Sequence, residues 1–126
     1  MKPISNFVRM FKPRFAALVE NGTKLQTVRP HPKRMPKAGD ILSLRCWRGA
    51  PYRSKQRVLR VAMITKVSEI AINKAAILID GRILALRDEP AFAQADGFAT
   101  PDEMRDWFRE THGLPFVGIV LYWHNT

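Results

Sequence analysis

The residues best suited to chemistry stand in a short polar string, GTKLQTVRP, at residues 22–30. Arg29 presents a planar fork of donors that matches phosphate or carboxylate, and Lys24 presents a compact cation. If 24–29 is a regular strand, Lys24 lies on the face opposite Thr27 and Arg29, because successive side chains alternate. A turn or bulge near Gly22 would instead bring all three together. Taken alone, such residues near a turn are more often solvated than functional.

Basic charge is concentrated in the first half of the chain. The 126 residues carry a net charge of +10, and residues 1–60 contain fifteen Lys or Arg against two acids, Glu20 and Asp40. Residues 61–126 contain six basic and nine acidic residues. This asymmetry is typical of proteins that bind nucleic acid. The alternatives are a solvated face that only maintains solubility, or a surface for anionic lipid, which would require an amphipathic basic helix.

Several common kinds of site do not fit the sequence. The histidines, His31, His112 and His124, are widely spaced, and Cys46 has no partner at metal-ligand spacing, so we expect neither a metal nor another cofactor. A single cysteine excludes an internal disulfide. The sequence contains no Walker-type phosphate loop, no long apolar segment and no recognisable signal peptide. We therefore expect a cytoplasmic protein that does not enter a membrane.

The placement of apolar residues, prolines and glycines predicts one α+β domain over residues 1–126. Helices are predicted over 13–21, over 89–95, and after Thr100, which begins a capping box completed by Glu103. The predicted strands are 4–10, 24–29, 41–47, 57–72, 75–79, 82–86 and 116–123, with Asp80-Gly81 as a two-residue hairpin turn. Strands joined by short turns favour a small curved or closed sheet with helices packed on it.

Taken in order, these motifs resemble the ASCH domain family. The resemblance rests on the strings FKPRF (11–15), GTKLQTVR (22–29), KAGD (37–40), ADGF (95–98) and PFVG (115–118), and on Trp123 near the end. It spans about the whole chain and is strongest to short, basic, phage- or prophage-type members, which carry a string like Arg53-Ser54-Lys55. The resemblance implies a PUA-like fold, a β-barrel of five to seven strands with two or three helices, and a cleft that binds RNA or a nucleotide.

Some members of this family hydrolyse the amide of an acetylated cytidine nucleoside, and the resemblance places that machinery at Lys24, Thr27 and Asp96. Lys24, its pKa lowered by burial and cationic neighbours, would take the proton of Thr27, which would attack the acyl carbon. Asp96 would orient the lysine or help to move protons. The family pattern has Glu at this position. A carboxylate one methylene shorter matters because catalytic geometry is sensitive to shifts of about 1 Å.

Other relatives cleave RNA without an obvious metal. That reaction requires a base for the ribose 2′-hydroxyl and a cation for the developing phosphorane charge, which Lys24, Lys55 and Arg29 can supply. Tyr52 and Ser54 can position the substrate, or Tyr52 can stack on a base. The charge asymmetry favours a polymer over an uncharged nucleoside. Because PUA-like domains often only bind, a binding module without catalysis is the third hypothesis.

The sequence thus predicts a cleft with two sides and an outer approach. One side holds Lys24, Thr27, Arg29 and Asp96, and the loop from Tyr52 to Lys55, including Arg53, lies across from it. An outer group on the proline-rich loop, Lys33, Arg34 and Lys37, would guide a polyanion toward the cleft. Trp47, Trp107 and Trp123 are expected in the core, with Trp47 the least firmly placed because basic residues follow it.

Overall fold

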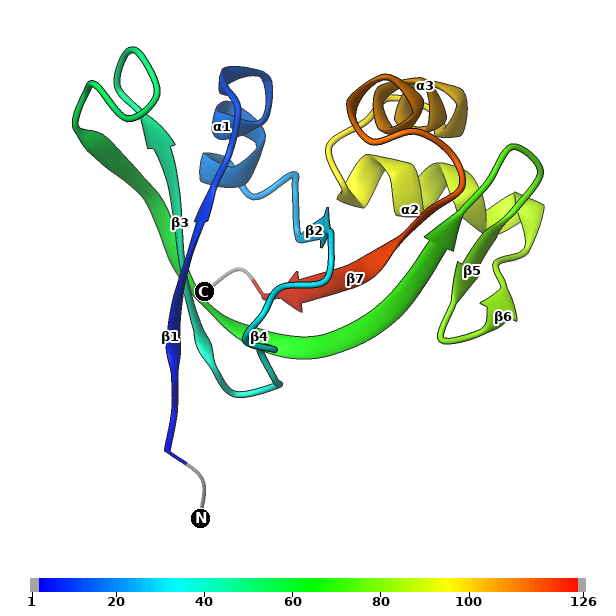
Figure 1. Cartoon of the computed structure of the whole chain (residues 1–126), viewed down its shortest axis with the longest axis horizontal. Helices are drawn as coiled ribbons and strands as arrows, with labels where there is room; N and C mark the ends of the chain where they lie inside the picture. Colours follow the sequence, from blue (N-terminus) through cyan, green and yellow to red (C-terminus); the bar gives the residue numbers. More distant parts are fainter. Residues whose placement is uncertain (1–2, 125–126) are drawn as a thin grey trace.

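A computed structural model describes residues 3–124 and has the α+β architecture that the sequence predicts (Figure 1). Within these residues, seven strands form one sheet that is accompanied by three α-helices. The elements in chain order are β1 (Asn6–Met10), α1 (Pro13–Glu20), β2 (Gln26–Arg29), β3 (Ile41–Trp47), β4 (Gln56–Ile72), β5 (Ile77–Ile79), β6 (Arg82–Ile83), the 3-10 turn η1 (Leu86–Asp88), α2 (Glu89–Ala95), α3 (Pro101–Thr111) and β7 (Phe116–Trp123).

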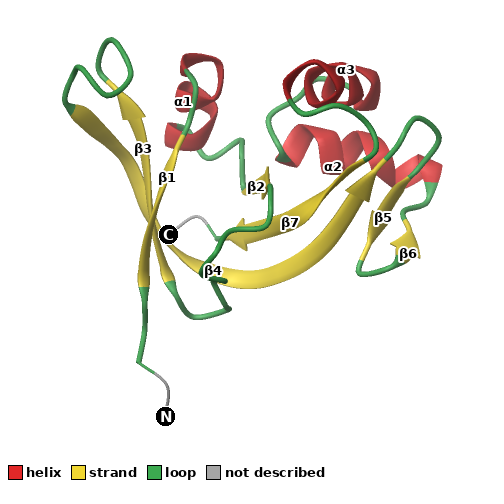
Figure 2. Cartoon of the chain, in the orientation of Figure 1, coloured by secondary structure: helices red, strands yellow, loops and turns green. Residues whose placement is uncertain are grey.

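The 17-residue strand β4 organises the sheet. Its first part pairs with β3, and its second part pairs with β7 along one edge and β5 along the other, all antiparallel. The register shifts between Leu44 and Arg45 and between Ile64 and Lys66, and such irregularities bend strands. Figure 2 shows the resulting curve of β4, with the helices on its concave side. The curved sheet therefore forms a cradle in which the helices pack.

The sheet is open between β1 and β2. β1 pairs in parallel with β3, β2 pairs antiparallel with β7, and within residues 3–124 no pairing joins β1 to β2. The small barrel expected from the sequence is therefore incomplete on this side. A side chain spans the gap, because Arg29 Nη2 at the end of β2 donates to the carbonyl of Met10 at the end of β1 at 2.7 Å.

Local sequence signals account for the element ends. Thr100 Oγ1 accepts a hydrogen bond from the N–H of Glu103 at 3.1 Å, so the predicted N-cap of α3 is confirmed. Glu103 Oε2 accepts from the N–H of Ala99, one residue before the cap, instead of completing the box at Thr100 itself. Asp80 and Gly81 both have positive φ, 51° and 79°, as a two-residue hairpin turn requires.

The hairpin around this turn is shorter than predicted, because β5 and β6 contain three residues and two residues. Ile83 in β6 is 72% exposed, so little packing extends the pairing. The core lies between the concave face of the sheet and the helices. Its largest fully buried side chains are Phe108, Leu42, Leu44, Ile64, Ile70, Ile72, Ile77, Met104, Ile119, Leu121, Val19 and Val120.

Candidate functional site

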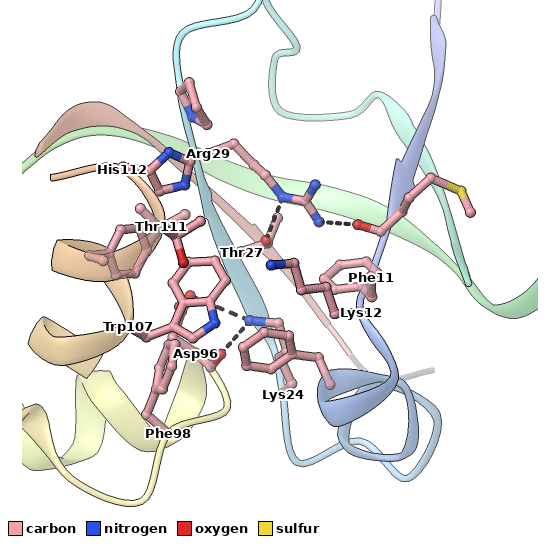
Figure 3. Close-up of a pocket in the computed structure, with 15 residues that line it drawn as sticks. Phe11, Lys12, Lys24, Thr27, Arg29, Asp96, Phe98, Trp107, Thr111 and His112 are labelled. Atoms are coloured by element: carbon pink, nitrogen blue, oxygen red, sulfur yellow. Dashed lines mark hydrogen bonds and ion pairs between the residues drawn. The ribbon is translucent and has the colours of Figure 1, made fainter. Parts of the chain in front are cut away.

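A cavity of approximately 220 Å³ lies beside the opening between β1 and β2. Its wall combines the end of β1, the start of α1, strand β2, the turn after α2 and part of α3 (Figure 3). The lining residues are Met10, Phe11, Lys12, Phe15, Lys24, Thr27, Val28, Arg29, Pro30, Asp96, Phe98, Trp107, Phe108, Thr111 and His112. Four of the site residues predicted from the sequence, Lys24, Thr27, Arg29 and Asp96, therefore share one cavity.

An irregular turn between α1 and β2 places Lys24 in this cavity. Gly22 follows the helix with φ +85°, in the left-handed region that glycine adopts without strain. The N–H of Lys24 then donates to the carbonyl of Leu18 at 2.9 Å, so Lys24 lies before the first residue of β2. The turned arrangement is thus the one observed. Strict strand alternation, which would separate Lys24 from Thr27, does not apply.

The Lys24 side chain is buried and bound to Asp96. It is 3% exposed, its Nζ donates to the main-chain carbonyl of Asp96, and the same Nζ lies 3.6 Å from Asp96 Oδ1. Gln26 Nε2 donates to that Oδ1 at 3.4 Å. Nζ also lies 4.9 Å from the centroid of the Phe15 ring, within range of a cation–π interaction. Both polar partners of the ammonium group therefore belong to Asp96, and the Phe15 ring of α1 adds an aromatic contact.

Burial changes the protonation of this pair. Loss of hydration lowers the pKa of Lys24 to about 8, with Asp96 opposing the change and Arg29 adding to it. Burial raises the pKa of the Asp96 carboxyl, against the attraction of Lys24. Lys24 can consequently become a neutral amine close to physiological pH. That is a requirement for a lysine that acts as a base.

Gly97 permits the close packing around the lysine stem. It has φ +97°, and a Cβ there would lie 3.2 Å from Lys24 Cδ and 3.1 Å from Phe15 Cδ1. Both the backbone conformation and the crowding favour glycine at this position. The Asp-Gly pair at 96–97 therefore supplies a carboxylate and the space beside it.

Arg29 binds two acceptors and keeps donors free for a ligand. Its Nε donates to Thr27 Oγ1 at 2.9 Å and its Nη2 donates to Met10 O, while the guanidinium lies 4.8 Å from the Phe11 ring centroid. Burial, and then the nearby Arg9, lower the pKa of Arg29 to about 10, so it remains a cation at neutral pH. Within residues 3–124, Nη1 has no hydrogen-bond partner.

The geometry around Thr27 bears on the acyl-transfer hypothesis. Thr27 is 3% exposed, and its hydroxyl oxygen accepts from Arg29, whereas Lys24 Nζ is directed at Asp96. Lys24 would have to turn away from Asp96 to take the proton of Thr27. The Arg29 guanidinium is placed to stabilise negative charge on the Thr27 oxygen.

Aromatic side chains form most of the remaining wall, although their sequence pattern indicated the core and not a site. Trp107 is half-buried and meets the Phe15 ring edge to face at 5.7 Å, while Phe98 lies 5.8 Å from Trp107. Lys12 Nζ lies 5.4 Å from the Trp107 ring. Trp107 packs against the core as expected but also lines the cavity, so the core prediction was incomplete. Lys12 and Phe98 belong to the FKPRF and ADGF strings, which could have indicated them.

The loop Tyr52–Lys55 does not line the cavity, so the prediction that it forms the side across from Lys24 is wrong. It belongs to the turn between β3 and β4, residues 48–55, which we call the hairpin tip. In Figure 1 this tip lies on the far side of α1 from β2. Ser54 is used within the tip, because its Oγ accepts from Gly49 N and donates to Ala50 O, both at 2.9 Å.

The other tip residues face solvent. Tyr52 is 89% exposed, has φ 63°, and packs against Trp47 with ring centroids 5.1 Å apart. Arg53 and Lys55 are also exposed. The tip lies away from the cavity because β3 and β4 continue as a hairpin beyond the helix that covers the sheet.

The proline-rich loop after β2 does contain exposed basic residues, but they differ in their contacts. Lys37 Nζ is paired with Asp40 Oδ1 at 2.7 Å, and Asp40, whose pKa this hydrogen bond lowers to about 2, also accepts from the N–H of Ser5. Arg34 Nη2 donates to the carbonyl of Asn6 at 3.1 Å. Lys33 is exposed. Lys37 thus already has an ion-pair partner within the fold, and Arg34 contacts the edge of β1.

The fold and cavity define an α+β protein with a small basic and aromatic site. The described residues contain no cluster of His, Cys, Asp and Glu that could hold a metal ion, and none of their helices is long and apolar enough to cross a membrane. No protein-family model matches the chain, and no curated protein matches it.

Among solved structures, the chain is similar to the crystal structure of protein EF3133 from Enterococcus faecalis V583, described as DUF984. The TM-score is 0.58 at 19% identity, and the match covers 98% of this chain and 82% of that one. Similarity at this identity concerns the fold alone. It agrees with a single small α+β architecture over the described residues.

Proposed function

We propose that this chain is an ASCH-type, PUA-like domain that binds RNA or a nucleotide, with one base held in the cavity at Lys24 and Asp96. The observation that carries the proposal is the composition of the cavity. Planar aromatic rings line it together with two desolvated cations, Lys24 and Arg29. A base offers a flat apolar face and polar edges, so it matches both kinds of wall.

The size of the cavity favours a single base or nucleoside unit. At approximately 220 Å³ it is smaller than the roughly 300–1,000 Å³ of pockets that enclose drug-sized ligands. A longer RNA would therefore insert one nucleotide, and the rest of the strand would lie outside. The net charge of +10 supports a ligand with phosphates over an uncharged nucleoside.

Lys55 was one of the cations assigned to RNA cleavage, and it is not among the cavity residues. A cleavage reaction at the cavity would therefore depend on Lys24 and Arg29 alone. This weakens the ribonuclease hypothesis relative to binding. Binding needs only the cations and aromatic rings that already meet in the cavity.

The test compares Arg29→Gln with Arg82→Gln, which removes the same charge from β6, at the opposite end of the strand order from β1. Fluorescence anisotropy would measure the affinity for a labelled single-stranded RNA, with competition by mononucleotides. We expect Arg29→Gln to lower the affinity for both ligands by about tenfold or more, since hydrogen bonds to charged groups contribute about 1.5–3 kcal/mol. Arg82→Gln should change either affinity by less than about threefold. Equal losses in the two variants would contradict a site at the cavity.

Amide hydrolysis is the second candidate, favoured by the lowered pKa of Lys24 in the same cavity as Thr27 and Asp96. Neutral Lys24 would accept the Thr27 proton as Thr27 Oγ1 bonds to the acyl carbon. The C–N bond then breaks, the proton passes to the departing amine, and water later hydrolyses the ester. Deacetylation of acetylated cytidine should rise with pH through about 8, level off above it, and disappear in Lys24→Met. If wild type releases no acetate at any pH, this candidate is wrong.

A further inference from the structure

The open edge of β1 carries three arginines in a row. In a parallel pairing, alternate residues direct their backbone groups to the partner strand, and Phe11 N–H donates to Arg45 O of β3. The carbonyls of the residues between, Asn6, Val8 and Met10, therefore lie along the free edge. Each accepts a hydrogen bond from a guanidinium.

The three donors come from three segments of the chain. Arg34 of the proline-rich loop donates to Asn6 O at 3.1 Å, Arg9 of β1 itself donates to Val8 O at 2.9 Å, and Arg29 of β2 donates to Met10 O at 2.7 Å. Alternate carbonyls of a strand are about 6.6 Å apart. We call this row of Arg34, Arg9 and Arg29 the arginine edge.

The rings of Phe7 in β1 and of Phe11, just after β1, lie against the guanidinium groups. Arg34 and Arg9 lie 4.2 and 5.4 Å from the centroid of the Phe7 ring, and Arg29 lies 4.8 Å from that of Phe11. Arg34 is exposed and the other two are partly exposed, so the row can be reached from solvent. One arginine of the row, Arg29, also lines the cavity.

Among the described residues, no carboxylate forms an ion pair with the arginine edge, although Asp96 attracts Arg29 at longer range. Within residues 3–124, none of the ion pairs includes Arg9, Arg29 or Arg34. Burial and the neighbouring Arg34 lower the pKa of Arg9, and Arg9 in turn lowers that of Arg29. Side chains that cover an unpaired strand edge protect it against aggregation. That role requires only a hydrogen-bond donor at each carbonyl, and a neutral donor would be sufficient. Three arginines without an ion-pair partner, gathered on one edge, are suited to bind an anion from outside the chain.

We propose that the arginine edge binds successive phosphates of a single-stranded nucleic acid that runs along β1 and delivers one base into the cavity. The inference rests on the proposed function, since the cavity supplies the end point of the strand. The spacing of alternate strand carbonyls is comparable to that of phosphates in an extended single strand. Arg29 would contribute at the point where edge and cavity meet.

The test uses Arg9→Gln/Arg34→Gln, with Arg82→Gln/Arg87→Gln as the matched control. The control removes the same two charges from β6 and η1, away from β1. Affinities for a single-stranded RNA octamer and for mononucleotides would be measured at several salt concentrations. Each phosphate contact contributes about 0.7 to the slope of log affinity against log salt for a single strand.

We expect the edge variant to lower this slope by about 1.4 for the octamer and to weaken octamer binding about ten- to thirtyfold at 0.1 M salt. Its mononucleotide affinity should stay within about twofold of wild type, and the control should retain the octamer slope. Equal loss of slope in the control would overturn the proposal. The proposal would also be overturned if the edge variant, shown by circular dichroism to be folded, lost affinity for mononucleotides and for the octamer to the same extent.

A second measurement covers the case in which the edge variant does not fold. For the wild-type protein, the salt slope should increase from a mononucleotide to a tetramer by about 0.7 for each phosphate reached by the edge. A slope that does not increase with length would reject the arginine edge, even where mononucleotides bind and depend on Arg29. If nucleotides and RNA both fail to bind, the proposed function is wrong and the inference with it. Length-dependent binding that is indifferent to Arg29→Gln would also overturn the proposal, because Arg29 belongs to both the arginine edge and the cavity.

Discussion

The cavity and the hairpin tip contain the same kinds of residue in opposite environments. Lys24 is 3% exposed and bound to Asp96, whereas Lys55 is exposed. The aromatic rings differ likewise, because Trp107 is packed into the cavity wall and Tyr52 is 89% exposed. Charge and residue type thus mark both regions equally, whereas burial distinguishes the cavity and alters the pKa values of Lys24 and Asp96 there.

The strand that supports β2 and the hairpin tip should also differ in their tolerance of a single methyl group. A Cβ at Gly118 in β7 would lie 2.2 Å from the backbone oxygen of Arg29, while one at Gly49 in the tip would lie 3.4 Å from the Ser54 side chain. Gly118→Ala must displace β2, and we expect it to lower the free energy of unfolding by about 3 kcal/mol or more. Gly49→Ala should lower it by less than about 0.5 kcal/mol.

Urea denaturation of both glycine variants measures this difference. The comparison fails if Gly118→Ala is as stable as Gly49→Ala, because β2 would then be free to move away from β7. A loss of nucleotide affinity in Gly118→Ala without loss of stability would show that the placement of Arg29 matters more for binding than for folding.

The pH dependence of stability should separate Lys24 from Lys55. The pKa of Lys24 is lowered from 10.5 to about 8, so the folded protein binds fewer protons than the unfolded chain between these values. The contribution of Lys24 to the free energy of unfolding therefore rises with pH across this window, by up to about 3 kcal/mol. Below about pH 8, Lys24 is charged in both states, and burial of that charge destabilises the folded protein by the whole amount.

Lys24→Met should remove this rise, and Lys55→Met should retain it. The measurement is urea denaturation from pH 7 to pH 10.5, with wild type minus variant as the quantity compared, so that other titrating groups cancel. Identical pH slopes in wild type and Lys24→Met would mean that Lys24 is hydrated in the folded protein.

The smallest effect is expected from the tip cations. Arg53→Gln/Lys55→Gln should weaken binding of a single-stranded RNA by less than about threefold at 0.15 M salt, because exposed charges are screened by salt. Mononucleotide affinity should be unchanged. Anisotropy titrations at two salt concentrations would check this, and a loss larger than that of Arg29→Gln would move the principal RNA contact from the cavity to the tip.

Local signals in the sequence were sufficient for most elements. The strands 41–47 and 116–123 have the predicted bounds, and the Thr100 cap and the Asp80-Gly81 turn form as expected. Each depends on residues within a few positions of one another, so backbone sterics and short-range hydrogen bonds determine it. The string at 22–29 likewise supplied Lys24, Thr27 and Arg29, but it left open whether a strand separates Lys24 from the other two or a turn brings all three together.

Contacts between distant segments were decided only in the tertiary structure. The resemblance pointed to Asp96 as a partner of Lys24, but its burial and raised pKa follow from packing α1, β2 and the turn after α2 together. The sequence by itself determined which residues are cationic and which segments are strands. The path of β3 and β4 past α1 took Lys55 away from the cavity, and the unpaired edge of β1 gathered Arg9, Arg29 and Arg34. Charge is a property of each residue, whereas desolvation and proximity depend on how separate elements pack.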